Sequence, residues 1–134
     1  MKLYLMRHGD AVSEHSDPNR PLSPKGKADV QKVAGFLKAA NIKVNEVYHS
    51  TKLRTEETAR IVQSAINPKA KLVQKDFLSP DDPIAKIVED LTQRKDDLML
   101  VGHLQQLPRI ISRLVLGDEN RFVISLDTST VAAM

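Results

Sequence analysis

The chain has 134 residues, of which 41% are hydrophobic and 28% are charged, and its net charge is +3. These proportions exclude a globally disordered chain and favour one compact domain, residues 1–134, with an apolar core. The absence of cysteine excludes disulfides, thiolate metal sites and a cysteine nucleophile. Because the sequence shows neither a signal-peptide pattern nor an apolar run of about 18 residues, we expect a cytoplasmic protein with no membrane contact.

The basic excess is small, and the lysines are spread along the chain instead of forming a cluster. Nucleic-acid-binding proteins usually combine a basic cluster with aromatic side chains, whereas this sequence has three Phe, two Tyr and no Trp. We therefore expect no nucleic-acid partner, and the excess positive charge favours anionic substrates.

The first predicted element is a run of four apolar residues, Leu3–Met6, which is typical of a short strand buried on both faces. Arg7, His8 and Gly9 follow at its carboxyl end, where ligands bind in open α/β sheets. A histidine there can serve as a nucleophile or as an acid and base, an arginine can hold an oxyanion, and a glycine admits a ligand close to the backbone. The polar loop over 10–20 has a length that is often functional.

Helices and strands then alternate to the end of the chain. Ser23 suits a helix N-cap and Pro24 the first helical position, so the apolar spacing predicts a helix over about Pro24–Ala40, closed by Asn41. The later elements are a strand at Val44–Ser50, a helix capped by Ser50 or Thr51 and ended by Asn67-Pro68, a strand at Leu72–Val73, a loop at Asp76–Pro83, a helix through Ile84–Leu91, a strand at Leu98–Val101, a helix through Leu107–Val115 closed by Gly117, and strands at Phe122–Leu126 and Thr130–Ala133. This alternation predicts an α/β fold with three αβα layers, in which helices flank a mostly parallel central sheet.

Several polar residues have ordinary structural interpretations. We expect His15 to be solvated in its loop and His49 to pack on its strand. Asp81 and Asp82 suit a turn and an N-cap before the helix at Ile84. No third ligand accompanies this acidic pair at a suitable spacing, so we expect no metal site. Fingerprints for nucleotide binding are also missing, which predicts no cofactor.

The strand at Leu98–Val101 repeats the pattern of the first strand, because it too ends in a glycine and a histidine, Gly102 and His103. If the two strands lie near each other in a parallel sheet, both imidazoles converge on one site. Arg54 lies in the first turn of the helix that follows the strand at Val44–Ser50. Two guanidiniums and a helix N-terminus favour phosphate. A neutral imidazole is a competent nucleophile towards phosphorus, and His103 can donate hydrogen bonds to the oxygens of the transition state.

Four stretches of the sequence carry a resemblance to a known family. They are Leu3–Gly9 with its final Arg-His-Gly, Arg20–Ser23 with Gly26, His49–Ala59, and Val101–His103. Together and in this order they resemble the histidine phosphatase superfamily, the phosphoglycerate mutase-like proteins, over nearly the whole chain. The compact size and the Arg-Pro-Leu-Ser segment are similar to the SixA-type phosphohistidine phosphatases within it.

The resemblance implies a metal-independent phosphatase that works through a phosphohistidine intermediate. It assigns the phosphoryl-accepting nucleophile to His8, and the rest of the phosphate pocket to Arg7, Arg54 and His103, with Arg20 near the rim. It also implies that relatives continue through another strand or hairpin beyond the end of this chain, so the sequence leaves open whether the chain is truncated at its last residue.

The substrate class depends on the leaving group. The ester-cleaving branch of the superfamily uses an acidic residue between Arg54 and His103 to protonate the leaving oxygen, and only Asp76, Asp81 and Asp82 are available here, without that branch's usual context. An imidazole leaving group needs less help from an acid than an alkoxide does. The short spacing also leaves no room for a lid, so we expect an open pocket that admits a side chain of another protein. These features favour the phosphohistidine of a signalling phosphotransfer protein, such as a histidine phosphotransfer domain.

Two alternatives stay open. The chain could be a phosphomonoesterase or mutase that acts on a small phosphorylated metabolite, or a non-catalytic module that binds phosphorylated proteins. The second alternative predicts loss of the nucleophile, whereas both histidines and both arginines are intact. The sequence does not identify the physiological substrate or the oligomeric state, although we expect a monomer.

Overall fold

The computed structural model describes residues 1–121 and 125–134. Its elements, in chain order, are β1 (Leu3–Arg7), α1 (Pro24–Ala39), β2 (Glu46–His49), α2 (Leu53–Ile66), β3 (Lys71–Gln74), α3 (Ala85–Gln93), β4 (Leu98–Gly102), α4 (Leu107–Leu116) and β5 (Val131–Ala133). The strands form one sheet in the order β3-β2-β4-β1-β5. The predicted α/β class is confirmed.

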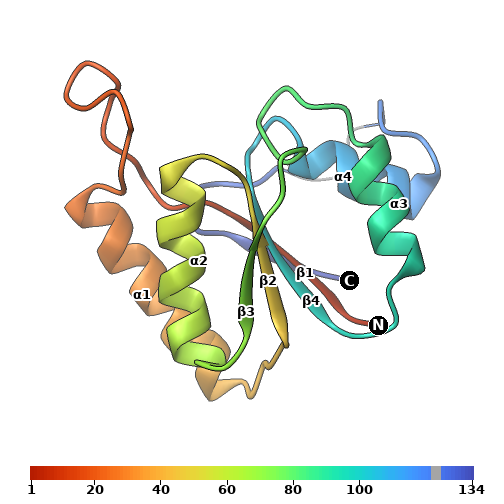
Figure 1. Cartoon of the computed structure of the whole chain (residues 1–134), viewed down its shortest axis with the longest axis horizontal. Coiled ribbons are helices and arrows are strands. Elements are labelled where there is room, and N and C mark those ends of the chain that lie inside the picture. The colour runs from red at the N-terminus through yellow and green to blue at the C-terminus, as the bar shows by residue number, and fades with distance from the viewer. Residues whose placement is uncertain (122–124) are drawn as a thin grey trace.

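The sheet is the middle of three layers, with α1 and α2 on one face and α3 and α4 on the other (Figure 1). Successive residues of a strand point to opposite faces, so β1 contributes to both cores. Leu3 and Leu5 pack with α3 and α4, whereas Tyr4 and Met6 pack with α1 and α2. Burial on both faces explains why the central strands are continuous apolar runs.

The strand pairing brings three carboxyl ends to one edge of the sheet. β1 runs parallel to β4, with Arg7 opposite Gly102, and β4 runs parallel to β2, with Val101 opposite His49. Only β5 is antiparallel to its neighbour β1 within the described part of the chain. The residues that follow β1, β2 and β4 therefore meet at a common edge.

Most predicted helix ends are found where the sequence places them. Ser23 is the N-cap of α1, and its hydroxyl accepts a hydrogen bond of 2.9 Å from Gly26 N–H. The helix ends at Ala39, one residue earlier than predicted, and Asn41 follows in the left-handed region with φ of +59°. Gly117 ends α4 with φ of +75°.

The predicted cap of α2 is wrong. The helix begins at Leu53 with Lys52 in the N-cap position, and no side chain caps it. Neither Ser50 nor Thr51 serves as the cap, and β2 is also shorter than predicted because it ends at His49. The Ser50 hydroxyl is bonded elsewhere, as described below for the site.

The predicted cap of α3 is also wrong, although the predicted turn is present. Ile84 occupies the N-cap position and makes no side-chain cap bond. The Asp82 carboxylate instead accepts a hydrogen bond of 2.9 Å from Ser79 N–H, which closes the turn before the helix. The Asp82 carboxylate is therefore bonded within the turn and does not cap the helix.

The end of the chain agrees in part with the prediction. Residues 122–124 of the strand predicted at Phe122–Leu126 lie outside the described residues, and Ser125 and Leu126 are not in a strand. Leu126 is buried in the core beneath α3 and α4. The last predicted strand is present as β5. Among the described residues, no helix combines the length and apolar character needed to cross a membrane.

Candidate functional site

Two histidines meet at the carboxyl edge of the sheet. His8 follows β1 and His103 follows β4, and their ring centroids lie 5.3 Å apart. The parallel pairing of β1 with β4 places them together, as the sequence pattern indicated. Both side chains are buried, with 7% of His8 and 1% of His103 exposed to solvent.

The tautomer of His8 follows from its hydrogen bond. Its Nδ1 lies 2.7 Å from the Gly9 carbonyl oxygen, which only accepts, so Nδ1 carries the proton and Nε2 carries the lone pair. Burial lowers the pKa of His8 to about 4; the bond to Gly9 opposes this shift, and Arg54, Arg7 and Arg20 add to it. His8 is therefore neutral at pH 7, with Nε2 available as a nucleophile.

Gly9 is held between two helices. Its N–H donates to Thr58 Oγ1 at 3.0 Å, and that hydroxyl donates to Arg54 O at 2.7 Å. A methyl group on Gly9 would lie 2.6 Å from a Val30 side-chain carbon and 3.2 Å from Gly26 O. The missing side chain thus lets α1 pack closely against the end of β1. The sequence analysis had instead expected this glycine to admit a ligand close to the backbone.

Arg7 and Arg54 approach the histidines from two elements. Arg7 ends β1 and donates from NH1 to Leu126 O at 3.0 Å, while Arg54 lies in the first turn of α2, with NH2 3.4 Å from His103 Nδ1. The Nε atoms of both arginines are buried without a hydrogen-bond partner among the described residues. Burial and the nearby Arg20 lower the pKa of Arg54. Both residues are half-buried, and half-buried cations with unused N–H donors form a site suited to an anion.

His103 has a different partner from His8. Its Nε2 lies 2.8 Å from Ser50 Oγ, and Ser50 Oγ lies 2.8 Å from Thr55 Oγ1. Burial lowers the pKa of His103 to about 3, and Arg54 and His8 add to the shift. The sequence analysis missed Ser50 and Thr55 because it interpreted Ser50 as a helix cap. The signal was available, since Ser50 follows a parallel strand as His8 and His103 do.

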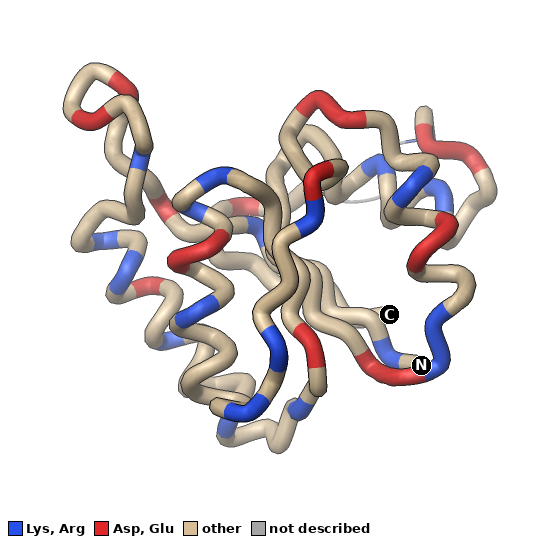
Figure 2. The backbone as a smooth tube through the Cα atoms, in the orientation of Figure 1, with Lys and Arg blue, Asp and Glu red and all other residues tan. Residues whose placement is uncertain are grey.

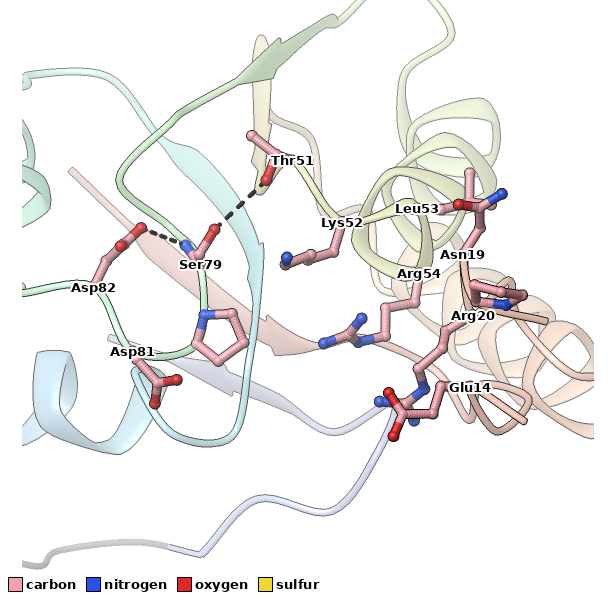
Figure 3. A pocket seen from close by; sticks show the side chains of 12 residues that line it. Glu14, Asn19, Arg20, Thr51, Lys52, Leu53, Arg54, Ser79, Asp81 and Asp82 are labelled. Atoms are coloured by element: carbon pink, nitrogen blue, oxygen red, sulfur yellow. Dashed lines mark hydrogen bonds between the residues drawn. The ribbon is translucent and has the colours of Figure 1, made fainter. Parts of the chain in front are cut away.

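A pocket of about 790 Å³ opens beside Arg54 (Figure 3). Its lining comes from three segments, namely Glu14 with Pro18–Arg20, Thr51–Arg54, and Ser79–Asp82. Neither His8 nor His103 lines it in the described part of the chain, and Arg54 connects the pocket with the buried histidines. In Figure 2, the acidic tip of the loop before α3 lies across from the basic start of α2.

Arg20 lies at the rim, as the sequence analysis expected. Its Nε donates to Val12 O at 3.0 Å, and its φ of +48° is unusual for a residue with a side chain. The same loop is tied to α2, because Leu22 N–H donates to Glu57 Oε1 at 2.8 Å. These bonds hold the guanidinium of Arg20 beside the pocket.

The three aspartates considered as a general acid differ in their position relative to the pocket. Asp81 and Asp82 line the pocket, whereas Asp76 does not. Asp81 is exposed. Glu14, which the sequence analysis did not consider, is an exposed residue of the lining, and no motif in its polar loop distinguishes it. The described residues include no group of three His, Asp or Glu side chains that could hold a metal ion.

The other two histidines agree with their structural interpretations. His15 is exposed in the loop after β1. His49 is buried at the end of β2, and its Nδ1 lies 2.8 Å from Ser50 O. Neither histidine is among the described residues that line the pocket.

Comparisons with known proteins agree with this geometry. The sequence model of the histidine phosphatase superfamily (branch 1) matches residues 3–79. The chain is similar to phosphohistidine phosphatase SixA of Escherichia coli (strain K12), with 25% identity over 123 residues that cover 88% of this chain and 76% of that protein.

Two solved structures show the same fold. The protein histidine phosphatase SixA in complex with tungstate has a TM-score of 0.87 and 24% identity, and the match covers 99% of this chain and 86% of that one. The alpha-ribazole phosphatase from Shigella flexneri has a TM-score of 0.78 and 18% identity, with 99% and 89% covered. The predicted phosphoglycerate mutase-like fold is thus confirmed, and the chain belongs to the histidine phosphatase superfamily, branch 1.

Proposed function

We propose that this chain is a metal-independent phosphatase that transfers a phosphoryl group first to His8 and then to water. One arrangement carries the proposal, namely two buried, neutral imidazoles beside two arginines with unused N–H donors. The oxygens of a phosphoryl group supply the acceptors that these donors lack. A SixA protein in the same fold binds tungstate, which is also an oxyanion.

The first step is attack on phosphorus by the lone pair of His8 Nε2. A P–Nε2 bond forms, the bond from phosphorus to the leaving group breaks, and the leaving group departs with the electron pair. Because His8 Nδ1–H stays bonded to the Gly9 carbonyl, the ring keeps its orientation and its developing positive charge is stabilised. Arg7 and Arg54 neutralise the charge on the transferring oxygens. Water then attacks phosphorus, the P–Nε2 bond breaks, and inorganic phosphate leaves neutral His8 behind.

For the substrate we propose phosphohistidine on a signalling phosphotransfer protein. When the other ring nitrogen carries a proton, this substrate releases a neutral imidazole and needs little help from an acid. The two carboxyl groups of the loop before α3 suit such a substrate, because Asp81 is exposed and Asp82 is engaged with Ser79 N–H. The two loops that line the pocket present exposed or half-buried, mostly polar side chains, as access for a protein-borne side chain requires. The similarity to phosphohistidine phosphatase SixA supports the same choice.

A second candidate is the hydrolysis of a small phosphate ester. The pocket of about 790 Å³ has room for a metabolite, and Asp81 in its wall could protonate an oxygen leaving group. The fold that the chain shares with an alpha-ribazole phosphatase supports this candidate.

The test compares a histidine-phosphorylated phosphotransfer domain with a panel of phosphate monoesters. Wild type, His8→Ala and His15→Ala are assayed together, because His15 is an exposed histidine outside the site. We expect fast loss of phosphohistidine with wild type and His15→Ala, no loss with His8→Ala, and slow cleavage of every ester. Fast ester turnover with an unreactive phosphoprotein would support the second candidate instead.

Trapping the phosphorylated protein separates catalysis from mere binding. Rapid acid-free quenching should capture phosphate on wild type and none on His8→Ala. If phosphate binds tightly and no phosphorylated intermediate is captured under any condition, the chain is a binding module and the proposed function is wrong.

A further inference from the structure

A chain of hydroxyl groups lies behind His103. Ser50 Oγ is 2.8 Å from His103 Nε2 and 2.8 Å from Thr55 Oγ1, and Thr55 Oγ1 donates to Lys52 O at 2.7 Å. The side chains of His103, Ser50 and Thr55 are buried. The mechanism proposed above makes no use of these two hydroxyl groups.

The direction of each hydrogen bond in the chain can be worked out. Thr55 Oγ1 lies 2.7 Å from Lys52 O and 3.3 Å from Ser50 O, and carbonyl oxygens only accept, so the single hydroxyl hydrogen of Thr55 goes to a carbonyl. Thr55 Oγ1 must then accept the hydrogen of Ser50. Ser50 Oγ is left as an acceptor, from Lys52 N–H at 3.2 Å and from His103 Nε2. His103 Nε2 therefore carries a proton.

The other ring nitrogen leads to the same tautomer. Arg54 NH2 lies 3.4 Å from His103 Nδ1, and a guanidinium only donates. Nδ1 must therefore accept with its lone pair. Two independent contacts, one at each nitrogen, thus agree on the Nε2–H form of His103.

We propose that Ser50 is a positioning residue, whose hydroxyl, oriented by Thr55, holds His103 as the Nε2–H tautomer so that Nδ1 accepts from Arg54. Its catalytic consequence rests on the proposed function, in which Arg54 neutralises the transferring phosphoryl group. In this tautomer, Nδ1 orients the guanidinium, and the Nε of Arg54 keeps its unused donor for the substrate. This tautomer describes the substrate-free site, whereas the donation from His103 to the phosphoryl oxygens that the sequence analysis expected belongs to the transition state.

Nitrogen-15 NMR of the histidine side chains tests the tautomer directly. In wild type without substrate, we expect His103 Nε2 to be protonated and Nδ1 to be unprotonated. In Ser50→Ala, the ring should become a mixture of both tautomers, because Nε2–H has lost its acceptor. In Thr55→Val, Ser50 is free to donate to Nε2, so the Nδ1–H form should increase.

Two exposed residues provide matched controls. Ser64→Ala removes a hydroxyl from the exposed side of α2. Thr92→Val removes a hydroxyl that bonds a backbone carbonyl three residues earlier, Glu89 O at 2.9 Å, as Thr55 does with Lys52 O. Both controls should leave the His103 signals unchanged.

Kinetics provides the second readout. Ser50→Ala should lower kcat about tenfold to a hundredfold, the loss expected for one buried hydrogen bond that orients a reacting group, with KM changed less than about threefold. An Nδ1–H tautomer in wild type, or Ser50→Ala with an unchanged tautomer and kcat within about twofold, would overturn the proposal. If Ser50→Ala does not fold, Thr55→Val decides. If wild type cleaves none of the substrates, the proposed function fails, whereas the NMR signals still test the role of Ser50.

Discussion

The floor and the rim of the site are built in opposite ways. We define the floor as His8, His103, Ser50, Thr55 and Thr58, all of which are buried and hydrogen-bonded to the backbone or to a neighbouring side chain. The rim is the pair of loops over 10–22 and 76–83, whose pocket-lining side chains are exposed or half-buried. The difference indicates that the floor determines the reaction and the rim selects the molecule that reaches it.

The physical reason lies in the surroundings of the polar groups. Within the buried floor, a hydrogen bond fixes one geometry and one proton position, and its loss leaves a group without a partner. At the exposed rim, water and salt screen each charge over about 8 to 10 Å. Substitutions in the floor should therefore change rates strongly for every substrate, whereas substitutions in the rim should change them weakly and in a substrate-dependent way.

Removal of the nucleophile should have the largest effect. His8→Ala eliminates the lone pair that attacks phosphorus in the first step of the proposed mechanism, so we expect the dephosphorylation rate to fall at least about a thousandfold. Single-turnover assays with phosphorylated substrate measure the loss, and His15→Ala is the matched control. Residual activity within about tenfold of wild type would mean that another group accepts the phosphoryl.

Arg54→Lys should come next, because it keeps the charge and removes the planar fork. A lysine cannot bond His103 Nδ1 and the phosphoryl group with a fixed pair of donors, so we expect kcat to fall about a hundredfold to a thousandfold. Arg60→Lys, on an exposed part of the same helix, should have no effect. An equally small effect of both changes would show that Arg54 does not contact the transferring phosphoryl group.

The buried histidines should make the protein sensitive to acid. Burial lowers the pKa of His8 to about 4, below its value of about 6.5 in an unfolded chain. The unfolded chain therefore binds more protons between these values, and the free energy of unfolding falls as the pH drops through this range. From pH 7 to pH 5, we expect His8 alone to cost about 2 kcal/mol. Urea denaturation at both pH values should show that His8→Ala removes this part of the loss, while His15→Ala does not.

Arg20→Ala tests the rim and should have a smaller effect. We expect KM for a phosphoprotein to rise about twofold to fivefold with kcat nearly unchanged, because an exposed or half-buried charge contributes about 1 kcal/mol or less. The effect should shrink as salt is added. A large fall in kcat that salt does not change would show that Arg20 contacts the reacting phosphoryl group.

Asp81→Asn and Asp82→Asn should have the smallest effect on phosphohistidine, less than about twofold each, because an imidazole leaving group needs little help from an acid. Asn keeps an oxygen that can accept from Ser79 N–H, so the turn before α3 should persist. Measurement of both variants on the phosphoprotein and on an ester completes the test. A loss of a hundredfold or so on the ester alone would make that carboxyl group a general acid and favour the second candidate function.

The two histidines of the floor can be predicted from the sequence, because their signals are local. The apolar runs of β1 and β4 predict buried parallel strands, and each run ends in its histidine. A capping serine followed by proline likewise predicts the start of α1. Such patterns depend on residues close together in the sequence, so they can be recognised without knowledge of the neighbouring elements.

The remainder depends on which elements become neighbours, and this only the tertiary structure decides. A serine after a strand can cap the next helix or bond a distant side chain, and the order β2-β4-β1 placed His103 within reach of Ser50. The same order determines which nitrogen of His103 carries the proton. The sequence by itself therefore determined the fold class and the residues at the strand ends, whereas the tautomer, the hydroxyl chain and the separation of floor from rim depend on long-range contacts that no local pattern encodes.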